Sequence, residues 1–394
     1  MNDLFILYRA EIKKILSKRS VWIAMVASLL FVLLVGFTNF SADGHGAYVK
    51  TQEKTLTEIS GQKLDQEFLD AYHARVDEEV LEHWDRYEKI SAYDPGAMYQ
   101  NASAATGQKA LYDLLYTIVR NREKVAGVTE TELYASMREN IIKDGREIGS
   151  SEEEIGEWLT VYDDIEKPIA YSYALAYLNI LDVLFIIGWA LIICISIALA
   201  GVFADEKTNR TDAIILASRK GRTPVCMAKI LAGVSVALFQ AVILLGGCFG
   251  MMFAFYGTAG WNFMIQNVIP SSPWNITIGK MVLICLALAA LVSVFFAMTN
   301  VLLSQITKSA VVTMALHAAV IFAGLFNMPG KMGLAAKLWQ LRPTMLMYYG
   351  TFCNTFMYGK LNNVEASFCI YGIGIILMVF ILIRSYGRSQ IESR

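Results

Sequence analysis

Six apolar stretches, each long enough for a membrane helix, constrain this chain more than any other feature of its sequence. They run approximately over residues 21–39, 177–203, 225–256, 279–303, 310–327 and 366–383. About 20 apolar residues in a helix cross the hydrocarbon layer of a bilayer, where every backbone amide needs a partner within the chain. The composition agrees, because 55% of the residues are hydrophobic and only 18% are charged. The sequence therefore predicts an all-α, polytopic membrane protein with six transmembrane helices.

The charges of the chain are segregated. Residues 41–175, between the first two apolar stretches, hold 14 Lys and Arg against 27 Asp and Glu, whereas the remainder holds 20 against 8. An acidic block without a long apolar run is typical of a soluble domain. We therefore expect three parts: residues 1–40, a helical acidic domain over 41–175, and the remaining spans over 176–394.

The distribution of lysine and arginine among the loops predicts how the chain is oriented in the membrane. With six crossings both chain ends lie on one side, and the loops of that side hold 15 of these residues, against four in the two short loops of the other side. Cytoplasmic loops carry such an excess. We expect a multi-pass plasma membrane protein with cytoplasmic N and C termini and an extracellular domain over residues 41–175.

The first 20 residues predict an amphipathic helix that lies along the membrane surface and leads into the first span. Arg9 and Lys13 fall opposite its apolar arc, and Ile6, Leu7 and Glu11 break the pattern. Positive flanking charge alone is the alternative interpretation. A cleaved signal peptide is disfavoured because no A-x-A site follows the apolar run. The apolar arc consists of Leu4, Phe5, Tyr8, Ile12, Ile15 and Leu16.

Two capping boxes predict helix starts in the acidic domain, at Thr129 with Glu132 and at Ser151 with Glu154. A long run over about 50–90 also has helical apolar spacing and is closed by a turn at Tyr93-Asp94-Pro95-Gly96. The acidity favours a solvated surface, and a site for a cationic ligand is the alternative. Further apolar residues at helical spacing are Leu64, Phe68, Leu69, Tyr72, Leu111, Leu114, Leu115, Ile118 and Val119.

No catalytic motif is present. The sequence has no G-x-x-x-x-G-K-[ST] phosphate loop, no H-E-x-x-H and no G-x-S-x-G. His73 and His83 lack metal-ligand spacing, so we interpret them as surface residues and expect no metal site. The chain is expected to be non-catalytic, with no cofactor of its own and no nucleic-acid partner.

Polar residues within the apolar stretches are candidates for a translocation path, because a polar group in lipid is costly. Structural hydrogen bonds between helices are the alternative. The candidates are Asp182, Gln240, Asn300 and His317.

The loop after the second apolar stretch has an unusual pattern. It reads ADEKTNRTDAIILASRKGRTPVCMAKILAG, in which a short apolar segment is bracketed by charges. A small helix there presents an apolar ridge with a charged rim, a shape that suits docking into a groove of a soluble partner. The order is an acidic residue, a threonine, an apolar run, an arginine and a lysine: Glu206, Thr211, Ile214-Ile215-Leu216, Arg222 and Lys229.

This pattern resembles the permease subunits of type-2 ABC exporters. Arg210 and Arg219 stand where that family commonly has glycine and proline. The N-terminal helix resembles the family's elbow helix, and residues of about 330–360 resemble its re-entrant outer hairpin. The resemblance implies a coupling helix over about 204–222 that contacts a cytosolic ABC ATPase, with ATP and Mg on that partner. The residues implied in the contact are Glu206, Thr211, Asp212, Ile215, Arg219, Gly221 and Arg222.

The resemblance also implies pairing with a second permease copy or a related permease, in contact with membrane lipid. The expected function is ATP-driven export of a peptide, drug or lipid-like molecule. The alternative is a membrane immunity or sensor protein that does not transport and binds a cationic peptide through its outer domain.

Overall fold

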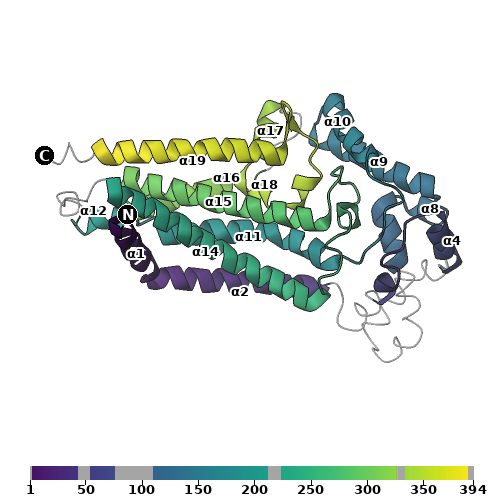
Figure 1. Ribbon diagram of the computed structural model, residues 1–394, viewed down its shortest axis with the longest axis horizontal. Coiled ribbons are helices and arrows are strands. Elements are labelled where there is room, and N and C mark those ends of the chain that lie inside the picture. Colours follow the sequence, from purple (N-terminus) through teal and green to yellow (C-terminus); the bar gives the residue numbers. More distant parts are fainter. Residues whose placement is uncertain are drawn as a thin grey trace.

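The computed structural model describes residues 2–42, 54–75, 110–211, 223–324, 326 and 333–388. These residues form a bundle of long helices with a smaller helical domain at one end (Figure 1). Five described helices are long and apolar enough to cross a membrane, which supports the expected multi-pass membrane protein. They are α2 (Arg19–Ala42), α11 (Leu175–Leu199), α14 (Thr223–Tyr256), α15 (Ile278–Thr307) and α19 (Asn363–Arg388).

The stretch expected as a further crossing, residues 310–327, forms a shorter helix. α16 (Ala310–Gly324) has 15 residues, a length of about 22 Å at roughly 1.5 Å per residue, against a hydrocarbon layer of about 30 Å. The side chain of Arg342, from the segment that precedes α19, meets the end of α16, where its Nε donates to the Gly324 carbonyl at 3.3 Å. The described residues therefore do not confirm six full-length membrane helices.

α11 is the central helix of the bundle and packs against α2, α14 and α15. It is apolar all round, as expected for a helix enclosed by others, and Val183, Ile187 and Leu191 are fully buried. α2 and α19 instead expose large apolar side chains on their outer faces. A membrane is the solvent that such faces require. Examples are Ile23, Leu30, Phe31, Ile376 and Phe380.

α1 (Asn2–Leu16) packs against α14 and forms the expected amphipathic helix. Ile15 is buried, and the Tyr8 hydroxyl lies 2.9 Å from the Ser235 hydroxyl of α14. The chain leaves helical geometry at Ser17 and Lys18 before α2 begins. α1 is therefore held to the bundle by its apolar side.

The smaller domain is built from α4 (Gln66–Arg75), a helix at Ala110–Val119, α8 (Arg122–Val125), α9 (Glu130–Ile148) and α10 (Glu152–Asp163). Both predicted capping boxes form, at Thr129 with Glu132 and at Ser151 with Glu154. The predicted apolar residues meet in one core, in which Leu69, Leu115 and Leu133 are fully buried. Local sequence signals therefore located these helices correctly.

The run over about 50–90 is not one continuous helix in its described part. A helical turn at 54–58 is followed by Gly61, whose positive φ of 92° ends the helix, and α4 begins only at Gln66. Lys63 forms an isolated antiparallel bridge with Ala170 in between. The predicted turn at residues 93–96 lies outside the described residues.

A compact segment between α16 and α19 joins the bundle to the smaller domain (Figure 1). Glu154 of α10 accepts hydrogen bonds from Lys337 Nζ and from the Met357 amide, the latter at 2.8 Å. At Gly145 of α9 a Cβ atom would lie 2.9 Å from Thr355 Oγ1, so glycine permits this close approach. The segment comprises α17 (Leu334–Gln340), α18 (Pro343–Leu346), η3 (Tyr349–Phe352), β1 (Met357–Tyr358) and β2 (Leu361–Asn362), the strands pairing Met357 with Asn362 and Tyr358 with Leu361.

Candidate functional site

α12 (Ala204–Thr208) is the first part of the loop to which the sequence pointed, and its Glu206 side chain faces the bundle. Glu206 is only 5% exposed. Its Oε1 accepts hydrogen bonds at 2.6 Å from Lys14 Nζ of α1 and at 2.6 Å from Lys229 Nζ of α14. This carboxylate therefore joins three segments that are far apart in the sequence.

The ammonium group of Lys229 is fully buried and fully hydrogen-bonded. Besides Glu206, it donates to Glu11 Oε2 at 3.1 Å and to the Val202 carbonyl at 2.9 Å. An ammonium has three donors, so each has an acceptor. Removing one partner from a buried ion pair costs about 3–5 kcal/mol, because the other charge remains buried.

Two lysines of the α1–α2 region complete what we call the α12 charge cluster: Glu11, Lys14, Lys18, Asp205, Glu206 and Lys229. Lys18 Nζ lies 2.5 Å from Asp205 Oδ2. Burial lowers the pKa of Lys14, but its hydrogen bond to Glu206 and the charges of Glu11 and Glu206 outweigh this, and the pKa is raised above its ordinary value. Lys14 therefore stays charged at neutral pH.

α15 is also tied to this region. The backbone amides of Phe203 and Ala204 both donate to the Ser304 hydroxyl oxygen, each at 3.1 Å. Phe203 precedes α12 and Ala204 is its first residue, so these amides lack acceptors within the helix, and the serine supplies one. The start of the loop is thus connected to α1, α14 and α15 by side-chain contacts.

The two described residues of the expected coupling contact lie together. Thr211 is exposed, and its amide donates to the Glu206 carbonyl at 2.9 Å. Glu206 turns its carboxylate into the bundle, toward Lys14 and Lys229. Asp212, Ile215, Arg219, Gly221 and Arg222 lie outside the described residues.

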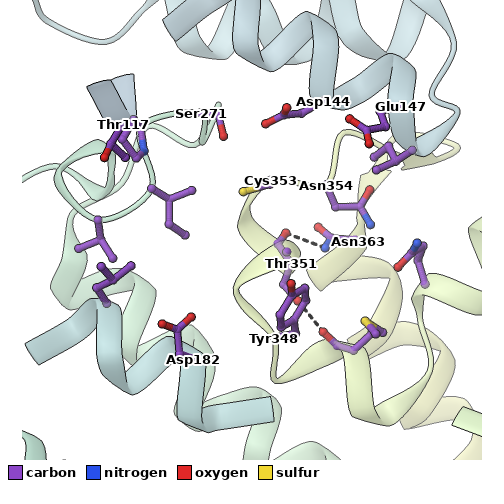
Figure 2. A pocket seen from close by; sticks show the side chains of 18 of the residues that line it. Thr117, Asp144, Glu147, Asp182, Ser271, Tyr348, Thr351, Cys353, Asn354 and Asn363 are labelled. Atoms are coloured by element: carbon purple, nitrogen blue, oxygen red, sulfur yellow. Dashed lines mark hydrogen bonds between the residues drawn. The ribbon is translucent and has the colours of Figure 1, made fainter. Parts of the chain in front are cut away.

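The four candidates for a translocation path are scattered. Gln240 and Asn300 are buried among the helices, where their amide groups donate to the carbonyls of Cys194 and Phe296. His317 is buried between Thr299 and Thr313, 3.2 Å from the hydroxyl of the first and 2.9 Å from the carbonyl of the second. Asp182 lines a cavity where the bundle meets the smaller domain (Figure 2), whereas His317 lines a different cavity together with Thr299 and Arg342.

The family comparison agrees with the loop pattern. A family model described as ABC-2 family transporter protein matches residues 5–383, which is nearly the whole chain. This chain belongs to the ABC-2 family of transporter proteins. No curated protein and no solved structure matches it. As an ABC-2 family member it is a membrane component of an ABC transporter, a role that implies an ATPase partner.

Sequence reasoning did not identify the buried partners within this ABC-2 protein. Glu11 was noted only as a break in the amphipathic pattern of α1, and Lys14 only as one of the cytoplasmic cations. The available signal was a carboxylate on the side of α1 that packs against α14. The partners of these residues lie 192 and 218 positions away along the chain.

Proposed function

We propose that the chain is the permease subunit of an ABC exporter, which moves a peptide, drug or lipid-like molecule across the plasma membrane with ATP hydrolysed by a separate ATPase chain. The observation that carries this proposal is the α12 charge cluster. The loop that the family uses for its ATPase contact begins at α12, and α12 is joined by buried ion pairs to α1 and α14.

The cluster suits the transmission of force. The contacts of Glu206 with Lys14 and Lys229 are both 2.6 Å long. Breaking them would leave charges buried without partners, which is strongly unfavourable. A displacement of the loop by the ATPase would therefore move α1 and α14 with α12, and the Ser304 contacts would carry part of it to α15. Thr211, Asp212, Ile215, Arg219, Gly221 and Arg222 are the residues that we assign to the partner surface.

The orientation forms part of the proposal. α1, α12 and the end of α19 lie at one end of the bundle, and the smaller domain lies at the other (Figure 1). The loops at the first of these two ends carry the excess of lysine and arginine. We therefore assign that end to the cytoplasm and the smaller domain to the outside. α16 and the segment before α19 would together complete the fifth of six crossings, and α19 would be the sixth. A second permease, identical or related, would complete the transporter.

Co-purification with the ABC ATPase tests the proposal. Arg219→Glu combined with Arg222→Glu reverses the charge of the partner surface and should release the ATPase from the purified permease. Lys13→Glu is the matched control, because Lys13 is exposed on α1 at the same end of the bundle. ATP hydrolysis by each purified complex gives a second measure, since coupling alters the ATPase rate.

The outcomes separate two ideas. If the ATPase stays with the charge-reversed variant, the loop is not the contact. If no ATPase accompanies the wild-type chain, the transporter assignment itself fails, and the alternative of a membrane immunity or sensor protein that binds a cationic peptide takes its place.

A further inference from the structure

A cavity of about 800 Å³ lies where the bundle meets the smaller domain. Figure 2 shows Asp182 of α11 on one side and Asp144 and Glu147 of α9 on the opposite side. Tyr348, Thr351, Asn354 and Asn363 line a third side, across from Thr117 and Ser271. We call this space the interdomain cavity. Its size is that of pockets that hold drug-sized ligands.

Negative charge exceeds positive charge in the interdomain cavity. Asp144, Glu147 and Asp182 contribute three carboxylates, and Arg120 contributes the one cation among the described lining residues. Arg120 is already engaged, with NH1 2.7 Å from Asp144 Oδ1 and NH2 3.0 Å from Ser271 Oγ. With three carboxylates and one arginine, the described lining carries an excess of negative charge, and a cationic ligand is favoured there.

The buried side chain of Asn363 indicates that the ligand carries a hydrogen-bond donor. Asn363 is 3% exposed, and its Nδ2 donates to the Thr351 carbonyl at 2.8 Å. That bond orients the amide, and Oδ1 is buried without a hydrogen-bond partner in the described structure. A buried acceptor without a donor is unfavourable. Asn363 lines the cavity, so a small shift of its side chain that exposes Oδ1 would let an N–H group of a ligand satisfy this acceptor.

Apolar side chains form the rest of the lining. Leu178, Val268, Ile269 and Met345 contribute methyl and methylene groups, and Tyr348 contributes a ring. Such surfaces bind the apolar part of a ligand, whereas a few polar groups select and orient its charged end.

We propose that the interdomain cavity binds an amphipathic cation with a primary ammonium or guanidinium group. Asp182 and Glu147 hold the positive charge, Asn363 Oδ1 accepts a hydrogen bond, and the apolar lining holds the remainder. This inference deepens the proposed function, on which it rests for the role of the ligand as the exported substrate. The binding itself needs neither the ATPase nor ATP.

The test uses the purified full-length chain in lipid nanodiscs without ATPase. The probe is arginine β-naphthylamide, a dication with a fluorescent apolar ring, and its uncharged counterpart is N-acetylcitrulline β-naphthylamide. We expect the charged probe to bind at least tenfold more tightly in fluorescence titrations, and to weaken as salt is raised because salt screens the carboxylates.

Neutral variants locate the site. Asp182→Asn with Glu147→Gln should weaken binding of the charged probe by tenfold or more. Glu139→Gln, an exposed carboxylate of α9 outside the cavity lining, should leave binding unchanged. Equal affinity for both probes in the wild-type chain would overturn the proposal without any variant, and so would unchanged binding in a double variant that elutes as a folded protein.

The rate of ATP hydrolysis shows whether a cation that binds in the cavity is also an exported substrate. In the complex with its ATPase, the probe should stimulate ATP hydrolysis if the bound cation is a substrate. Binding without stimulation would retain the cation site and remove its role in export. Stimulation that survives the double variant would place the substrate elsewhere and remove the cavity from the mechanism.

Discussion

At the α12 end of the bundle every carboxylate of the charge cluster contacts an ammonium group, whereas carboxylates outnumber cations in the interdomain cavity at the other end. Glu11, Asp205 and Glu206 each lie within 3.1 Å of a lysine Nζ. Among the described lining residues of the cavity, Arg120 contacts Asp144, and there are three carboxylates to this one arginine. Matched charges at short distance hold segments of one chain together, but an excess of one sign attracts an ion from outside. This difference is the basis on which we propose that the first end transmits force and that the second binds a ligand.

The largest expected effect comes from Lys229→Met, which removes the only fully buried ammonium of the cluster. Glu206 and Glu11 would then keep their charges with fewer partners, so stability should fall by about 3 kcal/mol or more. Unfolding of the purified chain in detergent measures this loss. Adding Glu206→Gln should restore part of it, since the double variant buries one charge fewer. Equal stability of both variants would show that the two residues are not coupled.

Glu154→Gln tests the contact between the smaller domain and the segment before α19. There Glu154 and Lys337 form an ion pair, as the carboxylates and lysines of the α12 charge cluster do. We expect the smaller domain to undock from the segment before α19, at a cost of about 1–3 kcal/mol. Faster hydrogen exchange in β1 and β2 would report this. Glu153→Gln, an exposed neighbour on α10, is the control.

The same contact predicts a dependence on pH. Burial raises the pKa of Glu154, but the hydrogen bonds from Lys337, Ser151 and Met357 outweigh it and hold the pKa below its ordinary 4.5. A lowered carboxyl pKa means that the stabilisation is present above pH 4.5 and is lost as the pH falls through the value in the folded protein. Docking should therefore weaken only in acid, and weakening between pH 6 and 8 would contradict this assignment.

Arg120→Gln sharpens the contrast between matched and unmatched charge. It frees Asp144, so the interdomain cavity should bind arginine β-naphthylamide about threefold to tenfold more tightly, the equivalent of roughly 1 kcal/mol. Arg138→Gln removes an exposed pair between Arg138 of α9 and Asp163 of α10, away from the cavity lining, and should not change the affinity. A weaker affinity after Arg120→Gln would mean that Arg120 itself contacts the probe.

The smallest effect is expected from Tyr8→Phe, which removes the hydrogen bond to Ser235 between α1 and α14. The loss should be about 0.5–1.5 kcal/mol, because the ring stays in place. The same unfolding measurement applies, with Ile6→Ala on the exposed side of α1 as the control. A loss as large as that of Lys229→Met would indicate that this hydrogen bond holds α1 to α14 as strongly as the charge cluster does.

Much of the fold follows from neighbours in the sequence. The capping boxes at Thr129 and Ser151 need only residues three positions apart, and both form. Apolar runs located five of the six expected spans. Where local patterns failed, a local cause is visible: the run over about 50–90 is interrupted at Gly61, whose positive φ a helix cannot accommodate.

The candidate sites were less accessible to such reasoning. Glu206 was selected for a contact with the ATPase, and sequence reasoning did not foresee that its carboxylate lies between Lys14 and Lys229. Glu154 was recognised as a helix cap, but the same carboxylate also accepts a hydrogen bond from Lys337, 183 residues away. Asp182 was an isolated intramembrane acid until the fold placed it across from Asp144 and Glu147.

The sequence by itself determined that the chain is helical, that its long apolar helices need a membrane and that an acidic domain interrupts them, because hydrophobicity and capping act over a few neighbouring residues. Only the tertiary structure decided which charges neutralise one another and which are left facing a cavity. The physical reason is that electrostatic energy depends on distance in space and on burial, and neither quantity is set by position along the chain.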